Sequence, residues 1–232
     1  MSTRSTVTSQ KGDRRSLVHL SRFFILVLVF LTIAPSYSHG VEPEGPPRPE
    51  CDTLSGATRA KLPLMRTAIL DVGMYVGLMV LWPHAFLPTE GSRAQFRESW
   101  TQPPYMNGSR IFFELDDDPW VINTVLHGLY GSEVYLAGRT YGHNGFVSFL
   151  YAVFASFTWE YLVESWFQRP SGIDLAWTPF AGAVIGELRY QLIRLILRGV
   201  STRVLRNILV TIIDPLGQME RAIMGCRLNC GD

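Results

Sequence analysis

The stretch SFTWEYLVESWFQRPSGIDLAWTPFAGAVIGE, residues 156–187, carries four carboxylates within one of the most apolar parts of the chain. They are Glu160, Glu164, Asp174 and Glu187. Removing a carboxylate from water costs several kcal/mol unless the group is paired, protonated or bound to a cation. Glu160 and Glu164 are also one helical turn apart, where like charges repel. The sequence therefore predicts a polar centre that needs compensating groups.

Two interpretations supply that compensation. Residues of the right type are the cations His127, Arg139 and Arg189 and the hydrogen-bonding residues Asn123 and Ser156. The first interpretation is a buried network that fixes helix register, formed by Glu160, Glu164, Asp174, Glu187, Arg139, Arg189 and Asn123. The second is a divalent-metal or acid/base site formed by His127, Glu160, Glu164 and Glu187. Mixed carboxylate and imidazole sets inside helical bundles bind iron or manganese, but the Glu-x-x-His motifs of ferritin-like proteins do not occur here.

Other chemistry has less support in the sequence. The chain contains no Gly-x-Ser-x-Gly elbow, no phosphate-binding loop and no zinc-protease helix. Its three cysteines, Cys51, Cys226 and Cys230, do not provide a tetrahedral zinc set. In an exported protein, Cys226 and Cys230 can form a disulfide, or Cys51 can link the amino-terminal part to the tail. The sequence leaves both pairings open.

The amino terminus has the pattern of an export signal. Arg14, Arg15 and Arg22 precede an apolar run over residues 23–33, and small residues follow at Ser36 and Ser38. We therefore predict a signal peptide over residues 1–38, and an uncleaved amino-terminal anchor is the alternative. Without residues 1–38 the chain keeps 16 basic and 19 acidic residues, a net charge of −3. This balance argues against a nucleic-acid partner.

Residues 39–60 begin with a stretch rich in Pro and Gly, and we expect them to form a linker before a single helical domain over residues 61–232. Helical patterns cover residues 66–86, a segment starting at Pro119 with Asp118 as its cap, residues 146–168 and residues 174–198. The last two are joined by a tight turn and predict an antiparallel helical hairpin. Gly182 and Gly186 give the second helix a small-xxx-small face that another helix can approach closely. We see no strand pattern, so the predicted fold class is an all-α compact bundle.

One feature of the sequence favours membrane association, and another argues against helices that span the membrane. The tail over residues 189–227 alternates arginines with aliphatic residues, as a membrane-surface helix does, although a helix covering a protein core has the same pattern. The apolar runs within residues 146–159 and 175–186 are shorter than the roughly 20 residues that a spanning helix needs. We therefore favour a bundle buried against or partly inserted in a membrane, with spanning helices as the alternative.

Residues 112–190 resemble a bacterial family known as domain of unknown function 3943. The resemblance is carried by a D-x-D-x-W-x-x-N-x-x-x-H-x-x-x-G segment, an R-x-x-G pair, an S-x-x-W-E-x-x-x-E segment and a P-S-x-x-D segment that continues to a final G-E. These patterns fall on Asp116, Asp118, Trp120, Asn123, His127, Gly131, Arg139, Gly142, Ser156, Trp159, Glu160, Glu164, Pro170, Ser171, Asp174, Thr178, Pro179, Gly182, Gly186 and Glu187. The resemblance implies a bacterial envelope protein and supplies no activity.

The functional expectation follows from these observations. We expect an exported protein on the periplasmic face of a membrane, acting as a non-enzymatic structural or assembly component. Its partner would be membrane lipid or an envelope protein. The alternative is a metal-dependent or acid/base envelope enzyme that acts on a lipid or cell-wall substrate through Glu160, Glu164 and His127.

Overall fold

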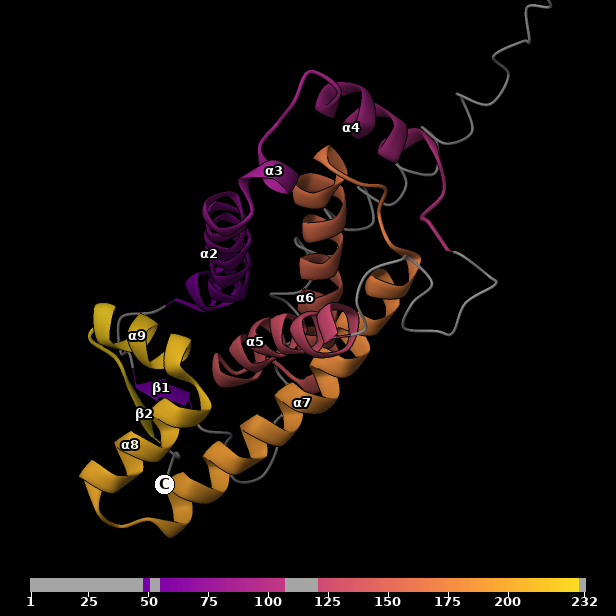
Figure 1. Ribbon diagram of the computed structural model, residues 1–232. Coiled ribbons are helices and arrows are strands. Elements are labelled where there is room, and N and C mark those ends of the chain that lie inside the picture. The colour runs from indigo at the N-terminus through magenta and orange to yellow at the C-terminus, as the bar shows by residue number, and fades with distance from the viewer. Residues whose placement is uncertain (1–47, 51–54, 107–120, 230–232) are drawn as a thin grey trace, which may run out of the picture.

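The computed structural model describes residues 48–50, 55–106 and 121–229, and these residues are mostly helical (Figure 1). The predicted all-α class is confirmed. The predicted signal peptide, most of the linker, Asp118 and the helix start at Pro119 lie outside the described residues. The elements are β1 (Arg48–Glu50), α2 (Gly56–Leu81), α3 (Pro83–Phe86), α4 (Ser92–Thr101), the π-helix η3 (Ile122–Leu126), α5 (His127–Thr140), α6 (Gly145–Thr158), the π-helix η4 (Trp159–Val163), the 3₁₀-helix η5 (Glu164–Trp166), α7 (Gly172–Gly199), α8 (Arg203–Ile213), α9 (Pro215–Ile223) and β2 (Arg227–Asn229).

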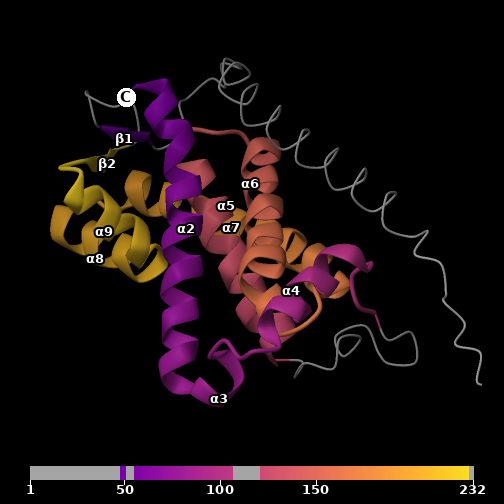
Figure 2. The same cartoon turned by 90° about the horizontal axis from the view of Figure 1, so that it is seen from above.

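Helix α5 is the centre of the bundle. It lies between α2 and α7 and also packs against α6, while α8 and α9 form a separate group at one end (Figures 1 and 2). The closest approach is between α5 and α7, where a Cβ added to Gly131 would lie 2.1 Å from the Thr178 carbonyl oxygen. A Cβ on Gly182 would lie 2.5 Å from the Gly131 carbonyl carbon. The predicted small-residue face of residues 182–186 is therefore confirmed, and α5 is the helix that packs on it.

Several helix boundaries differ from the sequence-based ones. Helix α2 starts at Gly56 rather than at residue 66, inside the predicted linker, because Ser55 caps it and Pro63 is accommodated within it. The predicted helix over residues 146–168 consists of α6, η4 and η5. The basic tail is also divided, because α7 ends at Gly199 and Asp214 then caps α9 ahead of Pro215. Asp214 and Pro215 together mark the point where α8 ends and α9 starts.

Two three-residue strands, which the sequence pattern did not predict, join the two ends of the described chain. Strands β1 and β2 are antiparallel, with Glu50 opposite Arg227 as their last pair. Cys226 is disulfide-bonded, and both other cysteines lie outside the described residues. The last described pair, Glu50 and Arg227, is directly adjacent in sequence to Cys51 and Cys226. Directly opposite residues in antiparallel strands have Cα atoms about 4.5–5.5 Å apart, a separation that a disulfide can bridge.

We therefore predict that Cys226 is bonded to Cys51 and that Cys230 is not part of this disulfide. Peptide mapping by mass spectrometry under non-reducing conditions should recover a peptide pair that joins residues 51 and 226 and that disappears on reduction. A fragment containing an intact bond between Cys226 and Cys230 would show that the register does not continue.

A second group of buried charges holds α2, α5, α7, α8 and α9 together. We call it the peripheral charge network, and it consists of Arg66, Glu133, Arg189, Asp214, Glu220 and Arg221. Arg66 donates to both oxygens of Glu220, at 2.7 and 2.6 Å, and Arg221 donates to Asp214 at 3.1 Å. Arg189 donates to Glu133 at 2.6 Å. These bonds connect α2 with α9 and α5 with α7, and Arg189 also donates to the Ile213 carbonyl oxygen at the end of α8.

Candidate functional site

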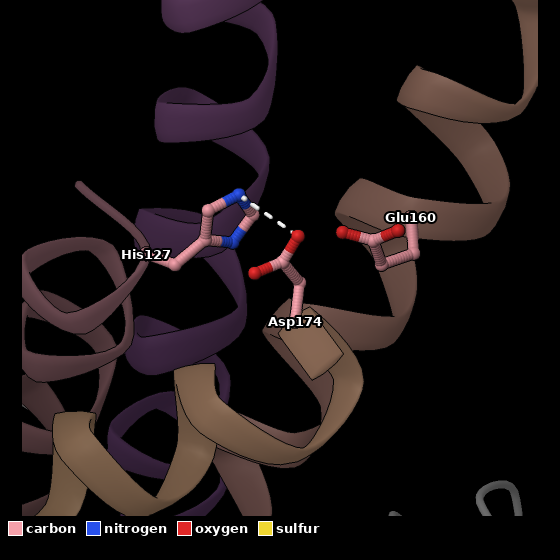
Figure 3. Close-up of side chains that lie close together, drawn as sticks. All are labelled: His127, Glu160 and Asp174. Atoms are coloured by element: carbon pink, nitrogen blue, oxygen red, sulfur yellow. Dashed lines mark ion pairs between the residues drawn. The ribbon is translucent and has the colours of Figure 1, made fainter. Parts of the chain in front are cut away.

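Three buried side chains from three different elements meet at the α5–α7 crossing: His127, Glu160 and Asp174 (Figure 3). We call them the central cluster. His127 begins α5, Glu160 is in the π-helix η4, and Asp174 is in the first turn of α7. Each offers one ligand atom, and these three atoms all lie within 4.8 Å of one another. Residues 127, 160 and 174 are thus brought together by packing of three helical segments.

The start of α7 positions Asp174. Ser171 caps this helix, and its Oγ accepts a hydrogen bond from the Asp174 backbone N–H at 3.2 Å. The Asp174 carbonyl oxygen accepts a hydrogen bond from Ser156 Oγ at 3.0 Å. In the usual capping box, the acidic residue at this position binds the backbone N–H of the cap. Here Glu160 takes that place instead, so the Asp174 carboxylate turns toward His127 (Figure 3).

Glu160 is almost completely enclosed. Its side chain is 1% exposed, and its Oε2 accepts a hydrogen bond from the Ser171 backbone N–H at 2.7 Å. Its Oε1 is buried and accepts no hydrogen bond from an N–H or hydroxyl donor of the described residues. Burial raises the pKa of Glu160 well above its ordinary value, and the charges of Glu164 and Asp174 and a hydrogen bond with the Glu164 carboxyl group raise it further. The single backbone donor only partly offsets these effects.

His127 has a defined orientation. Its Nδ1 lies 3.0 Å from Thr178 Oγ1, and its Nε2 lies 3.6 Å from Asp174 Oδ2. The hydroxyl of Thr178 can accept a hydrogen bond from Nδ1–H, which leaves the lone pair of Nε2 facing the two carboxylates. At 3.6 Å, His127 Nε2 and Asp174 Oδ2 are too far apart for a hydrogen bond, and they form an ion pair only when the imidazole is protonated.

Three of the residues predicted for this centre, Arg139, Glu187 and Arg189, lie elsewhere. Glu187 is near the middle of α7 and binds Arg139, with Nε to Oε2 at 2.9 Å. It also accepts hydrogen bonds from Tyr135 and Gln191. Burial alone would raise the pKa of Glu187, but the hydrogen bonds from Gln191 and Arg139 outweigh it and lower the pKa. Glu187 therefore does not join His127 and Glu160, as the predicted metal set required.

The other predicted residues also have assigned positions. Arg189 belongs to the peripheral charge network and binds Glu133. Glu164 lies one turn after Glu160 and accepts a hydrogen bond from Gln168. Asn123 is fully buried in η3, four residues before His127 in the sequence. Ser156 Oγ donates a hydrogen bond to the Asp174 carbonyl oxygen. Asp174, which the sequence placed in the network but not among the metal ligands, thus replaces Glu187 in the central cluster. Thr178, which orients His127, was not among the predicted site residues.

Access to the cluster is limited in the described part of the chain. Glu160 and Asp174 are each 1% exposed, and His127 is 8% exposed. A polar pocket of about 340 Å³ lies elsewhere, lined by Gln95, Glu98, Tyr105, Gln168 and Arg169. Of the two interpretations drawn from the sequence, this enclosure favours a centre that holds helices together over one that receives a substrate.

The comparisons with known proteins identify one family. Residues 112–216 match the family model described as "Domain of unknown function (DUF3943)". The match extends beyond the resemblance noted over residues 112–190 and includes the rest of α7, all of α8 and Asp214. No curated protein and no solved structure matches the chain.

Proposed function

Because the chain belongs to the DUF3943 family through residues 112–216, and that family has no assigned activity, we propose a function from the surface of the bundle. We propose that this is a non-enzymatic, membrane-associated structural or assembly component of the bacterial envelope. In this proposal, α2 contacts lipid, α7 offers a second apolar face, and the polar groups inside the bundle hold both helices in place.

The observation that carries this proposal is the outer face of α2. Its exposed apolar side chains recur every three or four residues, and we call this set, Met65, Ile69, Val72, Val76 and Val80, the α2 stripe. An 18-residue window of α2 has a mean hydropathy of 1.6, yet only 17% of that window is buried. Monomeric soluble proteins rarely leave a continuous apolar surface of this kind in water. Contact with a bilayer would cover it.

Not every apolar helix needs this explanation. Within the part of the chain that the structure describes, two helical segments are long and apolar enough to cross a membrane, Gly56–Leu81 and Gly145–Trp166. The second is 61% buried, because α6 packs against α5 and α7 in the core. Its composition is therefore accounted for by the bundle itself, whereas that of α2 is not.

A second exposed row follows α7 and supports an assembly role. It consists of Phe180, Val184, Leu188, Leu192 and Leu195, which we call the α7 stripe. Helix α5 lies between α2 and α7 (Figure 2), so the α2 stripe and the α7 stripe belong to two helices that flank α5. We propose that the membrane covers the α2 stripe and leaves the α7 stripe uncovered. The α7 stripe is then available to an envelope protein, and α5 connects the two faces.

Vesicle flotation tests the lipid contact. The chain without residues 1–38 should float with vesicles of phosphatidylethanolamine and phosphatidylglycerol. The double variant Ile69→Glu, Val76→Glu should bind on the order of 100-fold more weakly, since burying each aliphatic side chain contributes about 1.5–3 kcal/mol. Both side chains are exposed, so the bundle itself should stay folded.

The matched control also adds two glutamates, but on the polar helix α4: Ala94→Glu, Thr101→Glu, both at exposed positions. It should float as the unchanged chain does. Equal flotation of the α2 variant and the unchanged chain, with circular dichroism showing both folded, would refute the proposed role of α2.

A further inference from the structure

We propose that the central cluster of His127, Glu160 and Asp174 binds one divalent first-row transition-metal ion, which joins α5, η4 and α7. This inference is independent of the proposed membrane contact. It rests on the geometry of the three side chains, on a buried oxygen that no N–H or hydroxyl donor of the described residues reaches and on the way the surrounding residues orient the ligand atoms.

The spacing suits a single ion. The three ligand atoms lie within 4.8 Å of one another, and His127 Nε2 and Asp174 Oδ2 are 3.6 Å apart. Two atoms bound to one ion at about 2.0–2.2 Å are separated by roughly 3–3.5 Å. A small movement of side chains would therefore complete the site. Figure 3 shows the imidazole and both carboxyl groups directed toward a common space.

The second observation is the unsatisfied oxygen of Glu160. Buried carboxylate oxygens are expected to accept hydrogen bonds or bind cations. No N–H or hydroxyl donor of the described residues reaches Glu160 Oε1, although Oε2 of the same group is held by the Ser171 N–H. The carboxyl group of Glu164 is a hydrogen-bonding neighbour of Glu160, but two carboxyl groups can form that bond only when one of them is protonated. Glu160 also has no arginine or lysine partner within that part of the chain. A metal ion would supply the missing interaction at Oε1.

The surrounding residues orient the ligands as supporting residues do in metal sites. A metal-bound histidine usually donates its other ring N–H to a nearby acceptor, which fixes the tautomer. Thr178 Oγ1, at 3.0 Å from His127 Nδ1, is positioned to be that acceptor. The backbone of Asp174 is held on both sides, by Ser171 and Ser156. Moreover, Glu160 lies in a π-helical segment, and such segments often occur at functional sites.

The ligand types narrow the choice of ion. One imidazole and two carboxylates without a thiolate favour manganese, iron or zinc over copper(I), and the imidazole disfavours calcium and magnesium. Two carboxylates also balance the charge of a divalent ion, so the occupied site would be neutral inside the bundle. The enclosure of the site fits an ion that stabilises the fold.

Metal titration of the untagged full-length chain tests the site, with Zn²⁺ and Mn²⁺ as the probes. After treatment with a chelator, the unchanged protein should bind one of these ions at close to one per chain, measured by inductively coupled plasma mass spectrometry and calorimetry. Glu160→Gln and Asp174→Asn should lose this binding. Thr178→Val should bind about 10- to 100-fold more weakly, as removal of a supporting partner does.

The matched control is Glu187→Gln, a change of carboxylate to amide on the same helix as Asp174 but at the Arg139 pair. It should bind as the unchanged protein does. Absence of binding by the unchanged protein would overturn the proposal. Binding that persists in folded Glu160→Gln and Asp174→Asn, or that Glu187→Gln removes, would overturn it as well.

X-ray absorption on the metal-loaded, unchanged protein covers the case in which the variants do not fold. The proposal predicts one imidazole nitrogen and carboxylate oxygens at about 2.0–2.2 Å. Sulfur ligands, or two or more imidazoles, would place the ion at other residues and contradict the assignment.

Discussion

Replacing Asp214 by asparagine is expected to lower the free energy of unfolding by about 3 kcal/mol, because it leaves buried cations without their partner. Asp214 is fully buried and contacts the guanidinium groups of Arg66, at 3.5 Å, and Arg221, at 3.1 Å. Arg66 keeps its hydrogen bonds to Glu220, so Arg221 bears most of the loss. An asparagine oxygen can still cap α9, which isolates the effect of charge. Chemical denaturation in matched buffers measures the difference.

The same substitution should change how stability depends on pH. Burial alone would raise the pKa of Asp214, but the nearby charges of Arg66 and Arg221 outweigh it and lower the pKa. The unfolded chain therefore binds a proton more readily than the folded one. The stabilisation is present above the unfolded pKa of about 3.9 and is lost as the pH falls through the folded value.

As the pH falls below 5, the free energy of unfolding of the unchanged protein should therefore decrease more than that of Asp214→Asn. Glu90→Gln, at an exposed carboxylate, is the control and should behave as the unchanged protein. If the free energy of unfolding fell equally with pH in Asp214→Asn and in the unchanged protein, protonation of Asp214 would not be the cause of the loss of stability in acid.

Replacing Gly131 by alanine should lower the free energy of unfolding as much as Asp214→Asn does, because the added Cβ has no room. The new Cβ would lie 2.1 Å from the Thr178 carbonyl oxygen, a backbone atom that cannot move without separating α5 from α7. Overpacking of a close-packed core costs about 1–3 kcal/mol, and contact with backbone places this site at the upper end. We expect a loss of about 3 kcal/mol in the free energy of unfolding, measured by chemical denaturation.

Gly73→Ala is the matched control, because a Cβ at Gly73 in α2 meets no atom within 4 Å. Alanine favours helix over glycine by about 1 kcal/mol, so this variant should be slightly more stable than the unchanged protein. A similar change in stability for both variants would mean that α5 and α7 do not approach as closely as described.

Much of the fold could be predicted because it is encoded locally. The small-residue face and the helix stop before Pro170 follow from residues close to one another in sequence. The early start of α2 was missed because Gly56 and Pro63 are poor helix formers. There, the Ser55 cap and packing against the bundle override propensity.

The central cluster was predicted in part. His127 and Glu160 were chosen for their chemistry, and Asp174 was recognised only as a member of the network. The spacing of Ser171 and Asp174 matches a capping box, a local arrangement that on its own would turn the Asp174 carboxylate toward the Ser171 N–H. Its release toward His127 depends on Glu160 taking that N–H, a tertiary contact. Glu187 was assigned to the same centre, although 13 residues of α7 separate it from Asp174 by roughly 20 Å.

The peripheral charge network could not be predicted from the sequence. Arg66 and Glu220 are 154 residues apart, and nothing in their spacing indicates contact. Their meeting depends on α9 folding back toward α2, which the Asp214 cap and the turn at Pro215 allow. The structure therefore divides the predicted network into parts: the central cluster, the Arg139–Glu187 pair, and a charge network that includes Arg189.

The α2 stripe is the most direct place to test the proposed membrane role, through its depth in a bilayer. A spin label, introduced as an unnatural amino acid at Val72 on α2, would be compared with one at Ala94 on α4 in vesicle-bound protein. If α2 lies in the bilayer, the label at residue 72 will be accessible to oxygen and shielded from a water-soluble relaxation agent, whereas the label at residue 94 will be accessible to that agent. Equal accessibility of both labels to the water-soluble agent would show that α2 does not enter the bilayer.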